Sequence, residues 1–264
     1  MLHSTREYQM IRNMNTRRSL YIICLLLLSA VGNKLDAQTV VKPVRQQNDS
    51  TSHALIHQIG FDVRPGYVAP TNSFLEGDNA QRQKIDRSLS LHLKYAFQFS
   101  KDSYLGRLYP HAYQGIGVSH NTFYNSAELG NPVAVYAFQG APIVRFSSRL
   151  SLDYEWNFGA SFGWKQYDEH SNWYNDAIGS KINAYINLGF VLNWQFYPQW
   201  KLAAGVDFTH FSNGNTHYPN GGLNTIGGRV GIVRTFNAED KASGAIAPKR
   251  LYIKPVSYTH LRAH

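Results

Sequence analysis

Alternation of apolar and polar residues with a period of two is the feature that most constrains the fold of this chain. The clearest segments are 89–99, 150–158, 186–196, 202–209 and 225–232, with weaker ones at 57–68, 112–119 and 133–141. Successive side chains of a strand point to opposite faces, so this pattern predicts β-strands. No stretch after residue 37 keeps a helical period, and we therefore predict an all-β domain of eight antiparallel strands.

Two architectures bury such strands, and the residue types on the polar face distinguish them. A soluble sandwich or lipocalin-like barrel turns its apolar face inward, whereas an outer-membrane barrel turns it toward lipid and fills its lumen with small and polar residues. The polar positions here carry many Gly, Ser and Asn and few charges. They favour an eight-stranded antiparallel outer-membrane β-barrel over residues 55–236. The five tryptophans are interpreted as its interfacial girdle: Trp156, Trp164, Trp173, Trp194 and Trp200.

The lengths of the connections support the membrane-barrel interpretation. Exported barrels begin and end in the periplasm, so their odd-to-even connections lie outside the cell. Here those connections are long, at roughly 70–84, 120–131, 166–182 and 213–222. The even-to-odd connections are mostly shorter, and the tightest is Pro198-Gln199.

The N-terminal region carries the pattern of an export signal. Arg17 and Arg18 precede an apolar run from Leu20 to Gly32, which is too short to span a bilayer. Ala37 supplies the small residue expected at a signal-peptide cleavage site. We predict a signal peptide over 1–37; the alternative is an anchor helix. Residues 38–54 are polar and read as a flexible leader.

Composition excludes several other classes of protein. The chain has one Cys among 264 residues, which excludes a disulfide scaffold and a Cys-based zinc site. The net charge is +9, and cleavage after Ala37 removes five basic and two acidic residues to leave +6. An exported protein of this charge can meet anionic lipid head groups. Residues 237–264 read as a polar linker followed by a non-native or truncated tail, because the last nine residues resemble translated adapter sequence.

Two polar residues near the end of the seventh predicted strand stand out. His210 and Ser212 are two apart and share the face of Leu202, Val206 and Phe208, which is the lipid face. Polar groups are costly there unless they lie among head groups, which is the simplest interpretation. A serine beside an imidazole base is also an activated nucleophile. On the eighth strand Asn224 shares the outward face, so these three side chains can converge outside the wall.

These residues also resemble those of a known family. His210-Phe211-Ser212-Asn213-Gly214, followed by Pro219-Asn220-Gly221-Gly222, resembles the active-site segment of the lipid A 3-O-deacylases, the PagL-type acyloxyacyl hydrolases. The resemblance implies an eight-stranded outer-membrane barrel with its site on the outer wall. It implies that Ser212 is the nucleophile and His210 the base. It also implies that Asn220, with a backbone N–H near Gly214 or Asn215, binds the oxyanion.

One residue departs from the family pattern. The acid of the family's Ser-His-Glu site falls on Asn224, and the resulting Ser-His-Asn set resembles that of the outer-membrane phospholipase A family, whose twelve-stranded barrel uses calcium in its dimer. An amide can orient a histidine, so ester hydrolysis stays chemically sound.

The resemblance implies a serine esterase in the outer membrane of a Gram-negative bacterium, with its site at the outer leaflet. The substrate that the resemblance implies is lipid A of lipopolysaccharide; outer-membrane lipids, but no nucleic acid, are the expected partners. The first alternative is a phospholipase A, with calcium and a homodimer; the second is a non-catalytic barrel. No metal or other cofactor is expected for the deacylase, because the histidines show no metal-ligand spacing.

Overall fold

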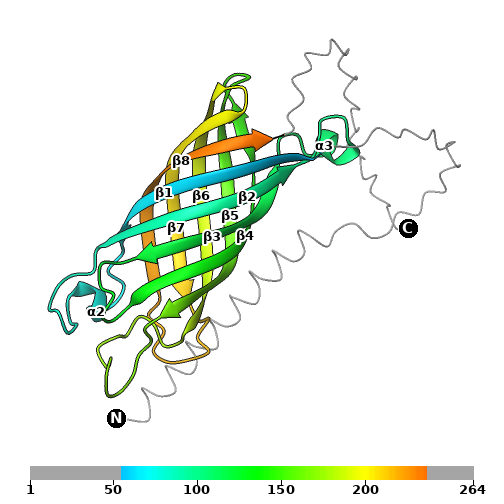
Figure 1. Cartoon of the computed structure of the whole chain (residues 1–264). Helices are drawn as coiled ribbons and strands as arrows, with labels where there is room; N and C mark the ends of the chain where they lie inside the picture. The colour runs from blue at the N-terminus through cyan, green and yellow to red at the C-terminus, as the bar shows by residue number, and fades with distance from the viewer. Residues whose placement is uncertain (1–54, 237–264) are drawn as a thin grey trace, which may run out of the picture. The chain divides into compact units, whose positions relative to one another are not determined.

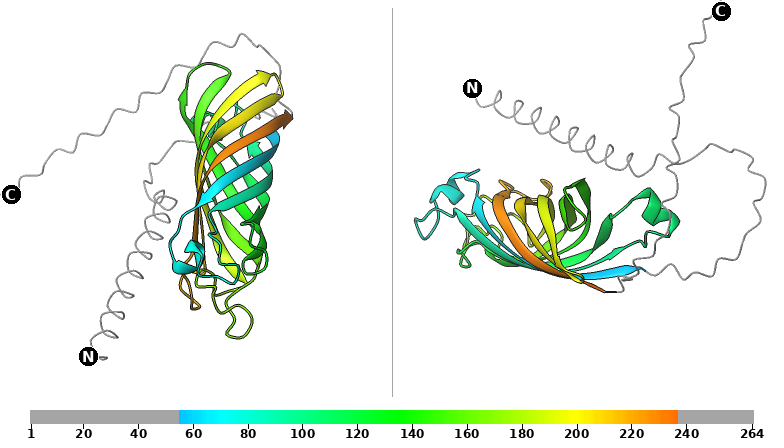
Figure 2. Two further views of the ribbon diagram at one scale, coloured as in Figure 1. Left: turned by 90° about the vertical axis from the view of Figure 1, so that its left-hand side faces the viewer. Right: turned by 90° about the horizontal axis from the view of Figure 1, so that it is seen from above.

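The computed structural model describes residues 55–236. Eight antiparallel strands pair in sequence order, and β8 pairs with β1 to close a barrel (Figures 1 and 2). The strands are β1 (Ile56–Val68), β2 (Arg87–Gln98), β3 (Tyr113–Thr122), β4 (Gly130–Arg145), β5 (Leu150–Trp164), β6 (Ile182–Tyr197), β7 (Trp200–Ser212) and β8 (Leu223–Phe236). The predicted eight-stranded barrel is confirmed. The predicted signal peptide, leader and tail lie outside the described residues.

The wall of the barrel has the inverted polarity that the pattern predicted. On β7, Val206 and Phe208 point outward and are about half exposed, whereas Asp207 between them is buried in the lumen. The tryptophan interpretation is wrong for Trp164, which is 5% exposed and packs inside the barrel against Phe123 and Phe211. A bulge in the β4–β5 pairing interrupts the alternation close to Trp164. A two-residue period in the sequence does not predict where such a bulge lies.

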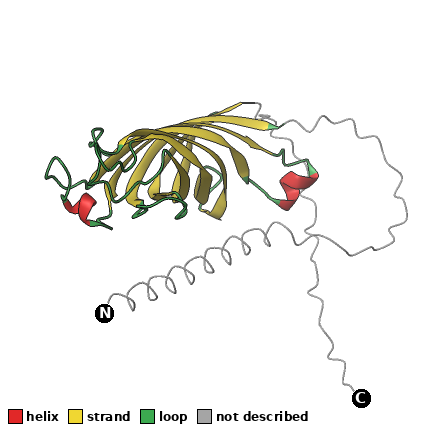
Figure 3. Cartoon of the chain, turned by 90° about the horizontal axis from the view of Figure 1, so that it is seen from below, coloured by secondary structure: helices red, strands yellow, loops and turns green. Residues whose placement is uncertain are grey.

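The connections at the two ends of the barrel differ in length and in number. One end carries 69–86, 123–129, 165–181 and 213–222, with the short helix α2 (Ser73–Glu76) in the first of them. The other end carries 99–112, 146–149 and 198–199; the first is longer than expected because it contains α3 (Tyr104–Leu108). Figure 3 shows the two helices at opposite ends. Within residues 55–236 no helix is long and apolar enough to cross a membrane.

An apolar cluster fills the lumen at the α2 end. Phe211 and Leu223 point into it from β7 and β8, and the aromatic rings of Trp164 and Tyr185 lie 5.1 and 5.4 Å from that of Phe211. Residues of the connections close the cluster from outside, including Phe74 and Leu75 of α2. This end of the barrel is therefore a packed core.

Six charged side chains fill the middle of the lumen and neutralise one another. Three are cations and three are carboxylates: Arg64, Lys94, Arg229, Asp62, Glu155 and Asp207. Arg229 donates to Glu155 at 2.7 Å and to Asp207 at 2.9 Å, and Lys94 lies 2.8 Å from Asp62. Each charge in this lumen network thus contacts the opposite charge, which offsets the cost of removing it from water.

Glycines on neighbouring strands make room for this network. Glu155 pairs with Gly140 and Gly189, and Asp207 pairs with Gly189 and Gly227. A β-carbon at Gly189 would lie only 2.6 Å from a carboxylate oxygen of Asp207. The abundance of glycine on the polar faces therefore has a steric cause in this barrel.

Removal of one cation from the lumen network should destabilise the barrel. We expect Arg229→Leu to lower the free energy of unfolding by about 3–5 kcal/mol, because it leaves Glu155 and Asp207 with one partner fewer. Arg234→Leu is the matched control on the same strand, because Arg234 is exposed and lies over the rings of Trp200 and Phe236; its cost should be about 1 kcal/mol or less. Urea unfolding in lipid vesicles measures both, and equal losses would contradict the assignment.

Candidate active site

The hairpin of β7 and β8 positions the candidate residues. His210 and Asn224 lie directly opposite each other in the pairing of the two strands, and Phe211 lies opposite Leu223. Because side chains alternate, Phe211 and Leu223 enter the apolar cluster while their neighbours His210, Ser212 and Asn224 point out of the wall. The same cross-strand pairing thus anchors the hairpin inside and aligns the polar groups outside.

The three outward side chains form a continuous hydrogen-bonded chain. Nδ1 of His210 lies 2.7 Å from Oδ1 of Asn224, and Nε2 lies 2.9 Å from Oγ of Ser212. An amide oxygen can only accept, so Nδ1 carries the ring hydrogen and donates to Asn224. Nε2 is then unprotonated and accepts the hydrogen bond from the Ser212 hydroxyl. This is the tautomer in which an imidazole can remove a proton from a serine.

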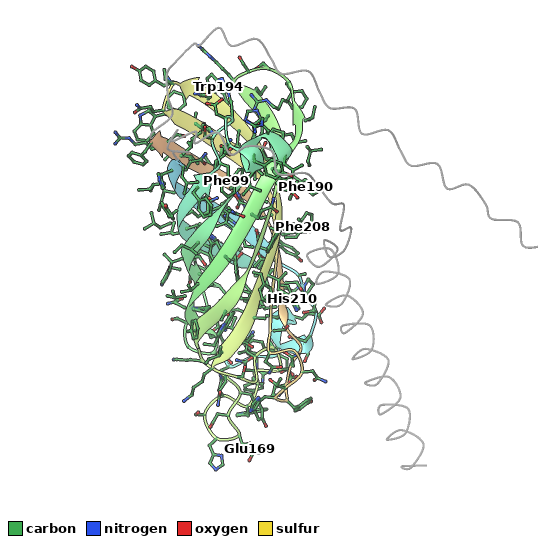
Figure 4. The ribbon with its side chains drawn as sticks, turned by 90° about the vertical axis from the view of Figure 1, so that its right-hand side faces the viewer. Phe99, Glu169, Phe190, Trp194, Phe208 and His210 are labelled. Atoms are coloured by element: carbon green, nitrogen blue, oxygen red, sulfur yellow. The ribbon has the colours of Figure 1, made fainter. Side chains whose placement is uncertain are left out.

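On β7 and β8 the outward apolar side chains end at this chain of polar groups. The next outward pair along the hairpin, Phe208 and Ile226, is 46% and 55% exposed. Figure 4 shows Trp194, Phe190, Phe208 and His210 in succession along the wall, with Glu169 at the tip of the adjacent end. His210, Ser212 and Asn224 are each partly buried. They can therefore meet a ligand whose apolar part lies along the wall and whose polar part lies beyond it.

The 213–222 connection brings amide groups close to Ser212. Asn220 accepts from the backbone N–H of Asn213 through Oδ1 at 3.1 Å, which leaves its NH₂ group to donate elsewhere. Gly214 and Asn215 both have positive φ angles, of 64° and 65°. Their backbone N–H groups donate to no acceptor among residues 55–236. Asn220 thus reaches the start of this connection, where Gly214 and Asn215 follow Asn213, and it bonds to Asn213 and not to Ser212.

A second connection, which the sequence did not point to, holds the site connection in place. Gly221 and Gly222 donate their backbone N–H groups to the carbonyls of Asp176 and Ala177, at 2.9 and 3.0 Å. Buried Asn175 fixes that segment, because its Oδ1 accepts from the N–H of Ala177 at 3.2 Å. These contacts join segments about 45 residues apart in sequence, so no local sequence pattern predicts them.

A similar Ser–His pair lies inside the lumen. Ser90 Oγ is 2.9 Å from Nε2 of His92, and Nδ1 of His92 is 2.8 Å from the hydroxyl of Tyr136. His92 and Tyr136 are buried within the barrel. This pair repeats the spacing of the outer site but points away from the outer surface, and it offers an internal control for that site.

Within residues 55–236 no three His, Cys, Asp or Glu side chains converge as a metal site. Calcium was expected only with the phospholipase A alternative, and the expectation of no cofactor stays a prediction.

The sequence matches the model of one known protein family. The family model described as lipid A 3-O-deacylase (PagL) matches residues 89–233, which run from β2 to β8 and include all three site residues. The chain belongs to this family. A comparison with curated proteins finds no match.

Similar solved structures include other small barrels. Neisserial surface protein A (NspA) is 8% identical over 68% of this chain and 97% of its own, with a TM-score of 0.44. The outer membrane enzyme PagL is 11% identical over 65% of this chain and 97% of its own, with a TM-score of 0.42. The N-terminal β-barrel domain of Pseudomonas aeruginosa OprF is 9% identical over 68% and 97%, with a TM-score of 0.38. Similarity at this level carries no information on function.

Membership of the lipid A 3-O-deacylase family, together with the closed barrel, assigns the chain to the outer membrane and to proteins that act on lipid A.

The backbone beside His210 generates a prediction. A β-carbon at Gly222 would lie 3.3 Å from the backbone carbonyl oxygen of Phe211 and 3.4 Å from Cε1 of His210, whereas one at Gly214 would meet no atom within 4 Å. Both glycines have positive φ, of 69° and 64°, so alanine strains the backbone at both sites. We expect Gly222→Ala to lower ester hydrolysis about tenfold more than Gly214→Ala, because its methyl group crowds the Phe211 carbonyl, which lies between the site residues His210 and Ser212 in the strand. Rates of the folded variants on a chromogenic ester compare the two; equal losses would exclude an effect of crowding beside His210.

Proposed function

We propose that the protein is a serine esterase that removes an ester-linked acyl chain from lipid A. Ser212 is the nucleophile, His210 the general base and Asn224 the group that orients His210. The observation that carries this proposal is the continuous hydrogen-bonded chain from Asn224 through His210 to Ser212, on the outward face of a barrel of this family.

The geometry suggests the order of proton transfers. Ser212 Oγ attacks the ester carbonyl while Nε2 of His210 takes the hydroxyl proton, and Asn224 holds the resulting imidazolium through Nδ1. The NH₂ group of Asn220 and the free N–H groups of Gly214 and Asn215 are the candidate donors to the oxyanion. His210 then returns the proton to the leaving sugar hydroxyl, and the acyl chain remains on Ser212. Water attacks this acyl-enzyme through the same base and releases the fatty acid.

Small side chains continue the outward row of the wall beside Ser212. The cross-strand row that contains Ser212 continues through Ala184 of β6 to Ala160 of β5, both small and outward-facing. The rows on either side carry bulkier, exposed apolar side chains: Phe158, Phe162, Ile182 and Ile186. A fatty acyl chain laid along the alanines would contact apolar groups on both sides while its ester reached Ser212. The same strip lies in the apolar surface that faces lipid, so the substrate needs no route through the lumen.

The positions of the ends of β1 and β8 support a site at the outer leaflet. β1 begins and β8 ends at the barrel end opposite to the site, and barrels exported to the outer membrane keep their termini in the periplasm. The site would then lie at the outer leaflet, where lipopolysaccharide is found.

Asn224 is the observation that favours a second candidate, a phospholipase A. The Ser-His-Asn set resembles that family, and an exposed wall site places no limit on the head group. The two candidates release different products, which lipid analysis separates.

Lipid composition of cells that express the protein tests both candidates. Mass spectrometry should show lipid A that has lost one hydroxyacyl chain, and Ser212→Ala or His210→Ala should abolish the change, because a nucleophile–base pair contributes about four to six orders of magnitude in rate. Ser90→Ala is the matched control, since it removes the serine of the enclosed pair and should leave the reaction unchanged. Lysophospholipid in place of altered lipid A would identify the phospholipase. Full activity of folded Ser212→Ala would reject the site.

Substitutions of Asn224 test the third role. An amide orients His210 but brings no charge to stabilise the imidazolium, so Asn224→Ala should lower the rate by about tenfold to a thousandfold, less than Ser212→Ala. Asn224→Glu restores the carboxylate of the family pattern and should retain activity while adding a loss of rate at low pH, where the carboxyl is protonated. Ester hydrolysis by refolded variants across pH gives both results. An Asn224→Ala rate equal to that of the parent would reduce the site to a Ser212–His210 pair.

A further inference from the structure

The lumen opens into a cavity at the end of the barrel opposite to the candidate active site. Its volume is about 300 Å³, and its lining comes from the ends of strands and from the connections 99–112, 146–149 and 198–199. The lumen network forms its inner boundary through Lys94, Glu155 and Arg229. The apolar cluster and the lumen network separate the cavity from the opposite end, so it is open on one side of the barrel only.

Unpaired cations surround this cavity. Lys101, Arg145, Arg149 and Lys201 line it, and none has a carboxylate within 4 Å among residues 55–236. Asp153 is the acidic lining residue outside the lumen network. Because the lumen network itself is neutral, four cations against one carboxylate give the cavity a net charge of +3.

Neutral polar side chains line the same space, and one of them has a hydroxyl without a partner among the described residues. Thr235 is 7% exposed and lines the cavity, and its hydroxyl has no partner among the described residues. The side chains of Gln58, Gln98 and Asn193 add amide groups to the wall. The cavity thus combines fixed positive charge with neutral donors, as sites for oxyanions do.

The pKa of one lining histidine responds to the same positive charges. His111 precedes β3, outside the strands, and burial together with the charges of Arg145, Lys101 and Lys201 lowers its pKa to about 4. At neutral pH the ring is therefore uncharged, and an anion bound beside it would favour its protonation.

We propose that this cavity binds a small multivalent oxyanion, a phosphorylated or polycarboxylated solute, from the compartment that faces the β6–β7 turn. The Arg145 and Arg149 guanidinium groups supply forked donors to its oxygens, Lys101 and Lys201 supply point charges, and Thr235 donates its hydroxyl. Lipid is not the ligand here, since the cavity lies inside the wall. The proposal does not depend on the activity proposed for Ser212.

Calorimetric titration of the full chain in non-ionic detergent tests the site, with pyrophosphate and citrate as separate probes. Binding of either probe supports the proposal, and the comparison distinguishes phosphate from carboxylate recognition. The double variant Lys101→Gln/Arg145→Gln should weaken the affinity about tenfold or more, since each residue supplies a charge-assisted hydrogen bond. The control Lys84→Gln/Lys181→Gln removes the same charge from exposed lysines at the other end of the barrel and should change the affinity less than about twofold.

A second readout is the imidazole titration of His111, followed by NMR with and without saturating probe. Bound anion should raise the His111 pKa, while the exposed His217 at the other end should not respond. Equal loss of affinity in the two double variants would show attraction by net charge alone and overturn the site. Absence of binding at millimolar probe, or a His111 titration that the bound probe leaves unchanged, would overturn it as well.

Discussion

The neutral charge network in the middle of the lumen is the interaction on which the rest of this barrel depends. Three cations and three carboxylates from β1, β2, β5, β7 and β8 meet at hydrogen-bond distances, so the network connects strands that are not neighbours in the sheet. It occupies the space between the apolar cluster and the cavity lined by Lys101, Arg145, Arg149 and Lys201, here called the basic cavity. Side chains of the described residues therefore fill the lumen between the two ends, and the chemistry proposed for Ser212 uses only the outer wall.

The register of one hairpin determines both the apolar packing and the alignment of the outward polar groups at the α2 end. His210 lies opposite Asn224 in the same pairing that sets Phe211 opposite Leu223. A slip of one residue would turn Phe211 toward lipid and His210 into the apolar cluster, so burial of the aromatic ring enforces the alignment of the polar groups. The connection that holds Asp176 and Ala177 against Gly221 and Gly222 then fixes the loop above the serine.

The parts that sequence could predict are those that a local period encodes. Alternation revealed every strand and the polarity of the wall, and the spacing of His210 and Ser212 placed both on one face. It failed at Trp164, where a bulge changes the face on which the side chain lies. It also could not identify the backbone contacts of the 165–181 connection, or the cations around the basic cavity, because these come from separate segments that only the closed barrel brings together. Of the site, convergence of three side chains was predictable from strand geometry, whereas their hydrogen-bond distances and the partner of Asn220 were not.

The glycines opposite the lumen charges restrict which substitutions the interior of the barrel can accept. A carboxylate such as Asp207 and the glycine opposite it on β6, Gly189, occupy one shared volume, because a β-carbon at Gly189 would lie 2.6 Å from a carboxylate oxygen of Asp207. A larger residue cannot replace this glycine while the carboxylate stays, and loss of the carboxylate leaves both a void and unbalanced cations. Substitutions in the lumen are therefore tolerated only when residues on several strands change together. The interior would persist as an inherited unit, while the outward residues of the same strands stay free to vary one at a time and to acquire new substrates.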